Sequence, residues 1–172
     1  MIDSSLEGYL LDTCVASAAW DMGNPCHRQV QNSLSQIDND YVFISCITLA
    51  EIEYGLKTAP QIDAPRQKQV REEMSAYEVR DVNKHTAVHY SDIRAKLFNI
   101  YAPHENRNRR LKYVENLCEE TSGLTLGIQE NDLWIVSVAV QYNFILVTRD
   151  RAGGMKRVVD AASYQSRTQY WQ

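Results

Sequence analysis

Short apolar runs alternate with longer helical patterns along this chain, and that order constrains the fold more than any other feature. Strands are predicted at Tyr9 to Asp12, Tyr41 to Ser45 and Phe144 to Thr148, because these runs are apolar and rich in β-branched or aromatic residues. Strand–helix alternation predicts an α/β fold with three α/β/α layers and a mostly parallel central sheet. We expect residues 1–172 to form a single domain, since this length supports one sizeable core.

The helical segments carry recognisable start signals. Helices are expected over residues 13–20, 24–37, 48 to between 55 and 60, 64–76, 84–100 and 131–142. Asn24 is expected to cap the second of these, with Pro25 at its first position. Glu51 follows Thr48 at capping-box spacing. In the fifth helix, one face is expected to hold Val88, Ile93, Leu97 and Ile100. Further short strands are predicted at 78–82 and, at an edge, at Arg157 to Val159.

Residues 101–127 fit this plan poorly and are interpreted as an arginine-containing insertion with one helix, at about 109–120. Its basic residues include Arg107, Arg109 and Arg110. Such a cluster is typical of a solvated helix start. It also suits an arm that contacts RNA phosphates beside an acidic site.

Charge and cysteine usage exclude several classes. A net charge of −4 argues against a protein that coats nucleic acid with positive charge, although metal ions can carry the charge in an enzyme. Residues 1–8 lack the cationic start of a secretory signal, and the apolar stretch Leu133 to Val140 is too short to span a bilayer. The four cysteines form no CxxC pair, so reduced thiols and a cytoplasmic location, without membrane contact, are expected.

Four acidic residues stand where apolar runs end or helices begin: Asp12, Glu51, Asp132 and Asp150. Asp12 and Asp150 directly follow strand segments, and the carboxyl edge of an open α/β sheet is where ligand sites form. Carboxylates gathered there repel one another, and a divalent cation is the usual compensation. The sequence therefore predicts a metal site, provided that the four side chains meet.

Each residue also has a purely structural interpretation. Asp12 or Asp132 would serve as a helix cap, Glu51 as the capping-box residue, and Asp150 as part of a turn before Gly153-Gly154. Cys14 fits a small buried residue better than a nucleophile. Other metal sites have less support: Cys26-His27 lacks a second zinc pair, and the spacing of His85 and His89 also fits a surface helix.

These segments resemble the PIN domain, and within that family the VapC-type toxins of bacterial toxin–antitoxin pairs. The resemblance rests on YLLD, TLAEIEYG, NDLWIVSVAV and ILVTRD, and spans about residues 9–160. It implies an endoribonuclease dependent on Mg²⁺ or Mn²⁺ that cleaves tRNA, rRNA or mRNA. It also implies a homodimer that a cognate antitoxin protein neutralises.

By that resemblance, the catalytic residues are Asp12, Glu51, Asp132 and Asp150. Asp12 and Asp132 are expected as direct metal ligands, with Asp150 completing the site, while Glu51 binds through a water or orients the attacking water. Thr148 is expected to donate a hydrogen bond to a carboxylate and fix its rotamer. The alternative is a non-catalytic module whose acidic pocket binds an arginine of a protein partner.

Overall fold

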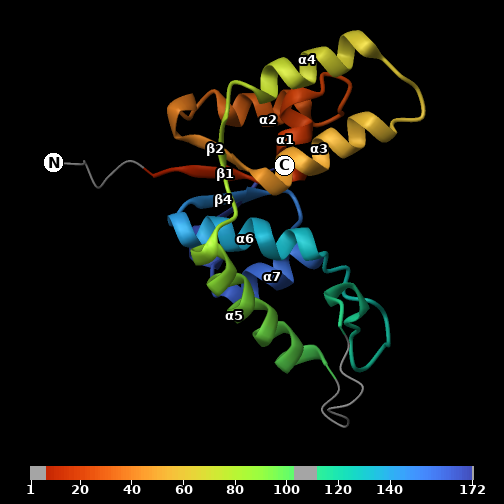
Figure 1. Cartoon of the computed structure of the whole chain (residues 1–172), viewed down its shortest axis with the longest axis vertical. Helices are drawn as coiled ribbons and strands as arrows, with labels where there is room; N and C mark the ends of the chain where they lie inside the picture. Colours follow the sequence, from red (N-terminus) through yellow and green to blue (C-terminus); the bar gives the residue numbers. More distant parts are fainter. Residues whose placement is uncertain (1–6, 103–111, 172) are drawn as a thin grey trace, which may run out of the picture.

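The computed structural model describes residues 7–102 and 112–171. Within these residues, five strands form one sheet and seven α-helices flank it (Figure 1). The strands are β1 (Tyr9–Leu11), β2 (Val42–Ser45), β3 (Glu78–Arg80), β4 (Ile145–Thr148) and β5 (Thr168–Tyr170). The helices are α1 (Thr13–Trp20), α2 (His27–Leu34), α3 (Cys46–Thr58), α4 (Ala64–Met74), α5 (Lys84–Tyr101), α6 (Glu130–Tyr142) and α7 (Gly154–Ala162). The predicted α/β class is confirmed.

The sheet is parallel throughout its described strands, in the order β3-β2-β1-β4-β5. β1 is central, and its Leu11 pairs with Ile44 of β2 and with Val147 of β4. The chain moves outward from β1 through β2 to β3, and later returns to the other side of β1 as β4. The strand order therefore reverses between β1 and β4, which is where ligands bind in open α/β sheets.

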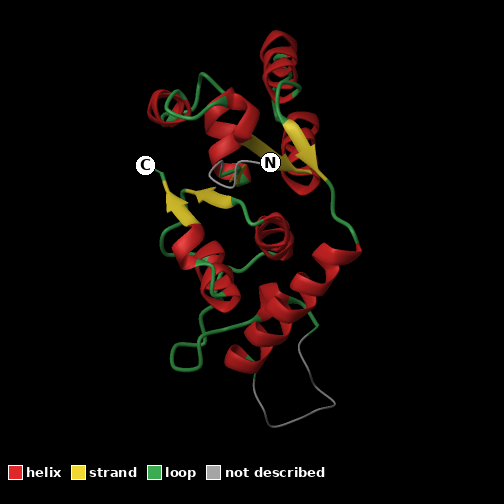
Figure 2. Ribbon diagram, turned by 90° about the vertical axis from the view of Figure 1, so that its left-hand side faces the viewer, coloured by secondary structure: helices red, strands yellow, loops and turns green. Residues whose placement is uncertain are grey.

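Two apolar cores lie on the two faces of the sheet because successive strand residues point to opposite sides. Leu10 and Phe43 belong to the core under α5, α6 and α7, whereas Leu11 and Ile44 belong to the core under α1 to α4. Figure 1 shows α1 to α4 on one side of the strands and α5 to α7 on the other, and Figure 2 shows the strands between these two groups. The three-layer prediction is confirmed.

The C-terminal residues add a strand that the sequence pattern did not predict. β5 pairs with β4, and the Trp171 amide donates to the Thr148 carbonyl at 3.0 Å. Before it, the buried Tyr164 hydroxyl donates to the carbonyls of Ala139 and Phe144, at 2.9 and 2.7 Å. The C-terminal aromatic residues therefore extend the sheet and anchor its edge to α6.

Several boundaries differ from the predictions. The second helix begins at His27 rather than at Asn24-Pro25, because the Asn24 side chain accepts from the Cys26 amide in a turn before the helix. α3 begins at Cys46, two residues before the predicted Thr48, since Ser45 caps it by accepting from the Thr48 amide. Glu51 consequently lies beyond the first turn and forms no capping box. That structural interpretation of Glu51 is wrong.

Three further predictions are wrong. Val88 and Ile100 are exposed on α5, and of the four predicted face residues only Ile93 and Leu97 are buried. The segment predicted as an edge strand at 157–159 lies inside α7. The helix predicted at about 109–120 is absent over residues 112–120, where the structure has a 3-10 turn at Val114–Asn116 instead. None of the helices in the described residues is long and apolar enough to cross a bilayer.

Candidate active site

Asp12 and Asp150 flank the point where the strand order reverses. Asp12 follows β1 directly, and its amide donates to the Val147 carbonyl of β4 at 2.9 Å. Asp150 lies two residues beyond the end of β4. The carboxyl ends of these adjacent parallel strands bring residues 138 positions apart to one edge of the sheet, as the spacing predicted.

The Asp12 carboxylate is 6% exposed and held in a fixed orientation. Its Oδ2 accepts from the Thr148 hydroxyl at 2.7 Å and from the Cys14 thiol at 3.0 Å, while Oδ1 accepts from the Thr13 amide at 2.7 Å. The expected hydrogen bond from Thr148 to a carboxylate is thus present. Burial raises the pKa of Asp12 above its usual value, because the charged form loses hydration. Asp12 also caps α1, so its predicted structural role is real.

Glu51 lies on α3, and both of its carboxylate oxygens are engaged. The Thr13 hydroxyl donates to Oε2, and the Asn131 side-chain amide donates to Oε1 at 2.8 Å. Thr13 begins α1 and Asn131 is in the first turn of α6. Glu51 is therefore hydrogen-bonded to the residue that follows Asp12 and to the residue that precedes Asp132.

Asp132 lies in the first turn of α6, where its Oδ2 accepts from the Gln129 amide at 3.1 Å. Burial, together with the negative charges of Asp12, Glu51 and Asp150, raises its pKa to about 7, against the lowering effect of the Gln129 amide. The four acidic side chains thus share one electrostatic environment, in which the charges of the other three all act on the pKa of Asp132.

Asp150 is bound to the start of α7. Its Oδ1 accepts from the amides of Ala152 and Gly153, and its Oδ2 accepts from the Met155 amide at 3.1 Å. The predicted turn interpretation of Asp150 is therefore confirmed as a local role. The Asp150 amide in turn donates to the Thr148 hydroxyl at 3.1 Å, which links this turn to Asp12.

The chemistry of the donor set fits a hard divalent cation, since carboxylate oxygens are the ligands that Mg²⁺ and Mn²⁺ prefer. Burial is the main cause of the raised pKa of Asp132, and the negative charges of Asp12, Glu51 and Asp150 add to it, so a bound cation would favour the charged form of this carboxyl. Across residues 7–102 and 112–171, however, no three His, Cys, Asp or Glu side chains are arranged to hold a metal ion as they stand.

Cys14 is a neighbour of this site that the sequence interpretation treated only as a buried small residue. Burial, together with the Asp12 charge, raises the pKa of its thiol to about 12, so the thiol stays protonated and donates to Asp12. Cys26 and His27 point to different partners: the Cys26 sulfur accepts from Arg149, and the His27 Nδ1 is 3.0 Å from the Ala18 carbonyl. Neither contact forms a zinc site.

Two contacts around Glu51 were not predicted, namely those from Thr13 and Asn131. The only available signal was that Thr13 follows Asp12 and Asn131 precedes Asp132 in the sequence. The predicted RNA-contacting residues Arg107, Arg109 and Arg110 lie outside the described residues.

The family follows from comparison with known sequences. The PIN domain family model matches residues 9–160, which is most of the chain and includes all four acidic residues. The chain belongs to the PIN domain family. No curated protein matches its sequence. The family assignment agrees with the resemblance in the sequence motifs.

Solved structures share the PIN domain fold of this chain. One similar structure is VapBC2 from Rickettsia felis, bound to a DNA fragment from the VapBC2 promoter. Its matching chain has a TM-score of 0.63 and 21% sequence identity, and the match covers 95% of this chain and 98% of that chain. FitAcB from Neisseria gonorrhoeae has a TM-score of 0.59 and 20% sequence identity, and the match covers 87% of this chain and 92% of that chain. VapBC-5 from Mycobacterium tuberculosis is a member of the VapBC family of toxin–antitoxin systems. It has a TM-score of 0.55 and 21% sequence identity, and the match covers 95% of this chain and 97% of that chain.

Proposed function

We propose that this PIN domain protein is a metal-dependent endoribonuclease whose catalytic residues are Asp12, Glu51, Asp132 and Asp150. The observation that carries the proposal is the hydrogen-bond geometry at the carboxyl edge of the sheet. Thr148 links Asp12 to Asp150, and Glu51 is bonded to Thr13 and Asn131, the sequence neighbours of Asp12 and Asp132. Perturbed acidic groups clustered at a topological switch point are typical of catalytic sites.

Asp12, Asp132 and Asp150 would hold Mg²⁺ or Mn²⁺. The bound cation would supply charge neutralisation on the phosphodiester and a water with a lowered pKa. Thr148 would keep the Asp12 carboxylate directed toward the shared site, through the hydrogen bond already present. Glu51, held by Thr13 and Asn131, would orient the attacking water.

The biological role proposed is that of a toxin acting on tRNA, rRNA or mRNA in the cytoplasm, as a homodimer, and neutralised by a cognate antitoxin protein. The support is the shared fold with VapBC-5, which is a member of a toxin–antitoxin family. The RNA phosphates are proposed to contact Arg107, Arg109 and Arg110, because the four carboxylates of the site repel phosphate groups.

The test is cleavage of total cellular RNA by purified protein with Mg²⁺, Mn²⁺ or EDTA. Asp12→Asn and Asp132→Asn are compared with the control Asp160→Asn, an exposed carboxylate paired with Lys156. We expect discrete metal-dependent cuts with the wild type and the control, and their loss in both active-site variants. The absence of cutting by folded, partner-free protein at any metal concentration would reject the nuclease and favour the alternative, an acidic pocket that binds a protein partner's arginine.

A further inference from the structure

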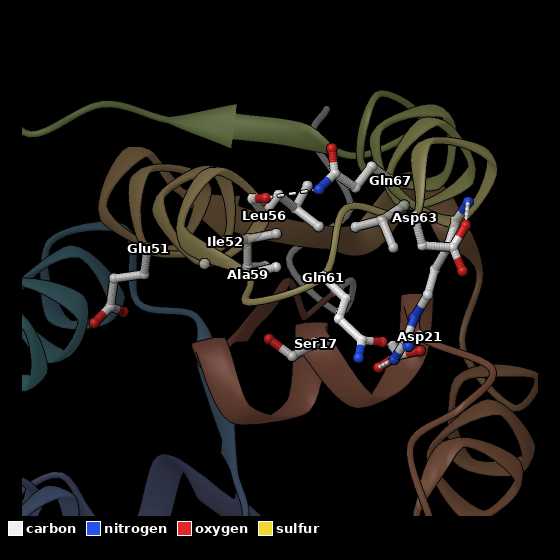
Figure 3. Close-up of a pocket in the computed structure, with 12 residues that line it drawn as sticks. Ser17, Asp21, Glu51, Ile52, Leu56, Ala59, Gln61, Asp63 and Gln67 are labelled. Carbon is white, nitrogen blue, oxygen red and sulfur yellow. Dashed lines mark hydrogen bonds and ion pairs between the residues drawn. The ribbon is translucent and has the colours of Figure 1, made fainter.

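The first turn of α6 carries Asp132, one of the four acidic residues, and Asn131, which donates to Glu51. Figure 3 shows Glu51 at the edge of a cavity of about 310 Å³ between α1, α3 and α4, with its carboxylate directed away from the other labelled side chains. Glu51 therefore faces the first turn of α6 rather than the interior of this cavity. The position of that turn decides how Glu51 and Asp132 lie relative to each other.

Arg94 of α5 holds the same turn through Glu130, its first residue. Arg94 Nη1 donates to both oxygens of the Glu130 carboxylate, at 3.0 and 3.3 Å. The Tyr90 hydroxyl donates to Glu130 and accepts from Arg94. One turn further along α6, Trp134 stacks on the Tyr90 ring with 3.8 Å between the ring centroids. The Glu130 side chain is thus bound to two side chains of α5.

Arg94 also joins this turn to the chain segment that begins at Lys112. Its Nη2 donates to the Lys112 carbonyl, and the Glu115 carboxylate accepts from the Glu130 amide at 3.1 Å. The segment is itself anchored, since Val114 and Leu117 are completely buried in the core on this face of the sheet. Arg94 therefore connects three parts of the protein: α5, the segment after Lys112 and the start of α6.

Glu130 and Asp132 project from opposite sides of α6, because residues two apart in an α-helix are separated by about 200° around its axis. The Glu130 side chain accordingly contacts α5, while the intervening Asn131 contacts Glu51 of α3. Bonds that fix Glu130 to α5 also fix the rotation of this turn about the helix axis. The direction in which Asp132 points is fixed with it.

The Arg94–Glu130 pair suits positioning better than overall stability. Its two side chains are 31% and 34% exposed, and ion pairs with this much contact with water contribute little to the free energy of unfolding. A guanidinium nevertheless donates in fixed directions from a rigid plane, so one arginine can orient several acceptors at once.

We propose that Arg94 is a positioning residue of the acidic site, which acts through Glu130 to hold the first turn of α6 so that Asp132 can bind the metal ion. This inference rests on the proposed function, because it concerns how a proposed metal ligand is held. Arg94 itself contacts neither the metal ion nor the RNA in this role.

The sign of the effect on metal affinity separates positioning from electrostatics. Removing a positive charge close to the acidic residues would by itself strengthen the binding of a cation. Positioning predicts the reverse, and we expect Arg94→Met to weaken Mn²⁺ binding by about tenfold, the lower end of the range for groups that orient metal ligands. Arg94→Lys keeps the charge, but one ammonium group lacks the fork that spans Glu130 and the Lys112 carbonyl. It should weaken Mn²⁺ binding as well, by less.

Arg167 provides the matched control, at the opposite end of α6. It is 26% exposed, donates to the Glu7 carboxylate at 3.2 Å and donates to the carbonyl of Asn143, the C-cap of α6, at 2.6 Å. Asn143 lies about 16 Å along the helix from Asp132. Arg167→Met therefore removes the same charge and the same kinds of bond far from the acidic residues, and it should bind Mn²⁺ at least as tightly as the wild type.

The experiment measures the Mn²⁺ affinity of each full-length, partner-free protein by titration calorimetry, and its melting temperature in EDTA. We expect similar melting temperatures for Arg94→Met and Arg167→Met, with weaker Mn²⁺ binding only in the Arg94 variants. Wild-type or tighter Mn²⁺ binding by folded Arg94→Met and Arg94→Lys would overturn the positioning role. If Arg94→Met does not fold, Arg94→Lys alone decides.

RNA cleavage is measured separately with Mn²⁺. Weaker Mn²⁺ binding in the Arg94 variants, without cleavage by any protein, would reject the ribonuclease function while the positioning role stands. Cleavage by the wild type, with unchanged Mn²⁺ binding in the Arg94 variants, would reject only the positioning role. A wild type that binds no Mn²⁺ would reject both.

Discussion

The Thr148 hydroxyl donates a 2.7 Å hydrogen bond to Asp12 Oδ2 and accepts one of 3.1 Å from the Asp150 amide. Thr148 is completely buried and Asp12 is 6% exposed. Because water cannot replace either partner, this one hydroxyl fixes the Asp12 carboxylate relative to β4 and to the turn that carries Asp150. Two of the four acidic residues are thereby coupled through a neutral side chain.

Thr148→Val removes the hydroxyl and keeps the shape of the side chain. We expect it to lower the free energy of unfolding by about 1–3 kcal/mol, because the buried Asp12 carboxyl loses a partner. RNA cleavage should fall as well, since Asp12 loses its fixed orientation. Urea unfolding and cleavage assays compare it with Thr148→Ser, which retains the hydroxyl. If Thr148→Ser is as defective as Thr148→Val, the hydroxyl is not the cause.

The sequence predicted the centre of the sheet well because its strands have strong local signals. β1, β2 and β4 are mostly buried apolar runs, and β1 and β2 lead almost directly into α1 and α3. β5 has only three residues and none of them is buried, so no alternation marks it. The β-branched Val158 and Val159 suggested a strand. They lie instead in α7 with their side chains buried in the core, and the Asp150 carboxylate accepts from the Gly153 and Met155 amides at the start of that helix.

The sequence predicted which acidic residues belong to the candidate site, but not the contacts that hold them. The acidic residues were found because they stand at predicted strand ends and helix starts. The contacts of Thr13 and Asn131 with Glu51 span 38 and 80 residues, so they depend on how α1, α3 and α6 meet. The cavity beside Glu51 has the same origin, since three helices and a loop line it. Sequence patterns describe single elements and carry little information on such junctions.

Asn131→Ala should weaken catalysis more than stability. The variant loses the 2.8 Å hydrogen bond that directs Glu51 Oε1, while the Thr13 hydroxyl still holds the other oxygen. We expect RNA cleavage to fall by roughly tenfold, as is typical when a supporting hydrogen bond at a metal site is removed. The melting temperature should change little. Asn32→Ala, at an exposed position of α2, is the control, and equal activity of the two variants would show that Asn131 does not position Glu51.

Gly154→Ala should destabilise the fold strongly. A Cβ at Gly154 would lie 2.0 Å from the Gly127 carbonyl oxygen and 2.6 Å from the Ile128 Cα, and backbone atoms cannot move aside cheaply. We expect a loss of about 1–3 kcal/mol in the free energy of unfolding. Gly55→Ala is the opposite case, since open space surrounds a Cβ at this position. We expect this variant to raise the free energy of unfolding by about 0.5–1 kcal/mol. Chemical denaturation measures both, and a Gly154→Ala protein as stable as the wild type would rule out this close approach.

Asp132 makes stability depend on pH in the metal-free protein. Burial and the charges of Asp12, Glu51 and Asp150 raise its pKa from 3.8 to about 7, so the folded state binds the proton more tightly than the unfolded chain. Its contribution to stability is therefore fully present below about pH 4 and is lost as the pH rises through about 7. The amide that Asp132→Asn introduces would remain neutral throughout this range.

Asp132→Asn should therefore match the wild type near pH 4 and exceed it above pH 7, by on the order of 1 kcal/mol or more in the free energy of unfolding. Urea unfolding in EDTA across this range measures the difference, with Asp160→Asn as the exposed control. Added Mn²⁺ at pH 8 should stabilise the wild type more than Asp132→Asn, because a cation relieves the repulsion only where the carboxylate is present. Parallel stability curves for the wild type and Asp132→Asn from pH 4 to 8 would show that Asp132 does not carry this charge.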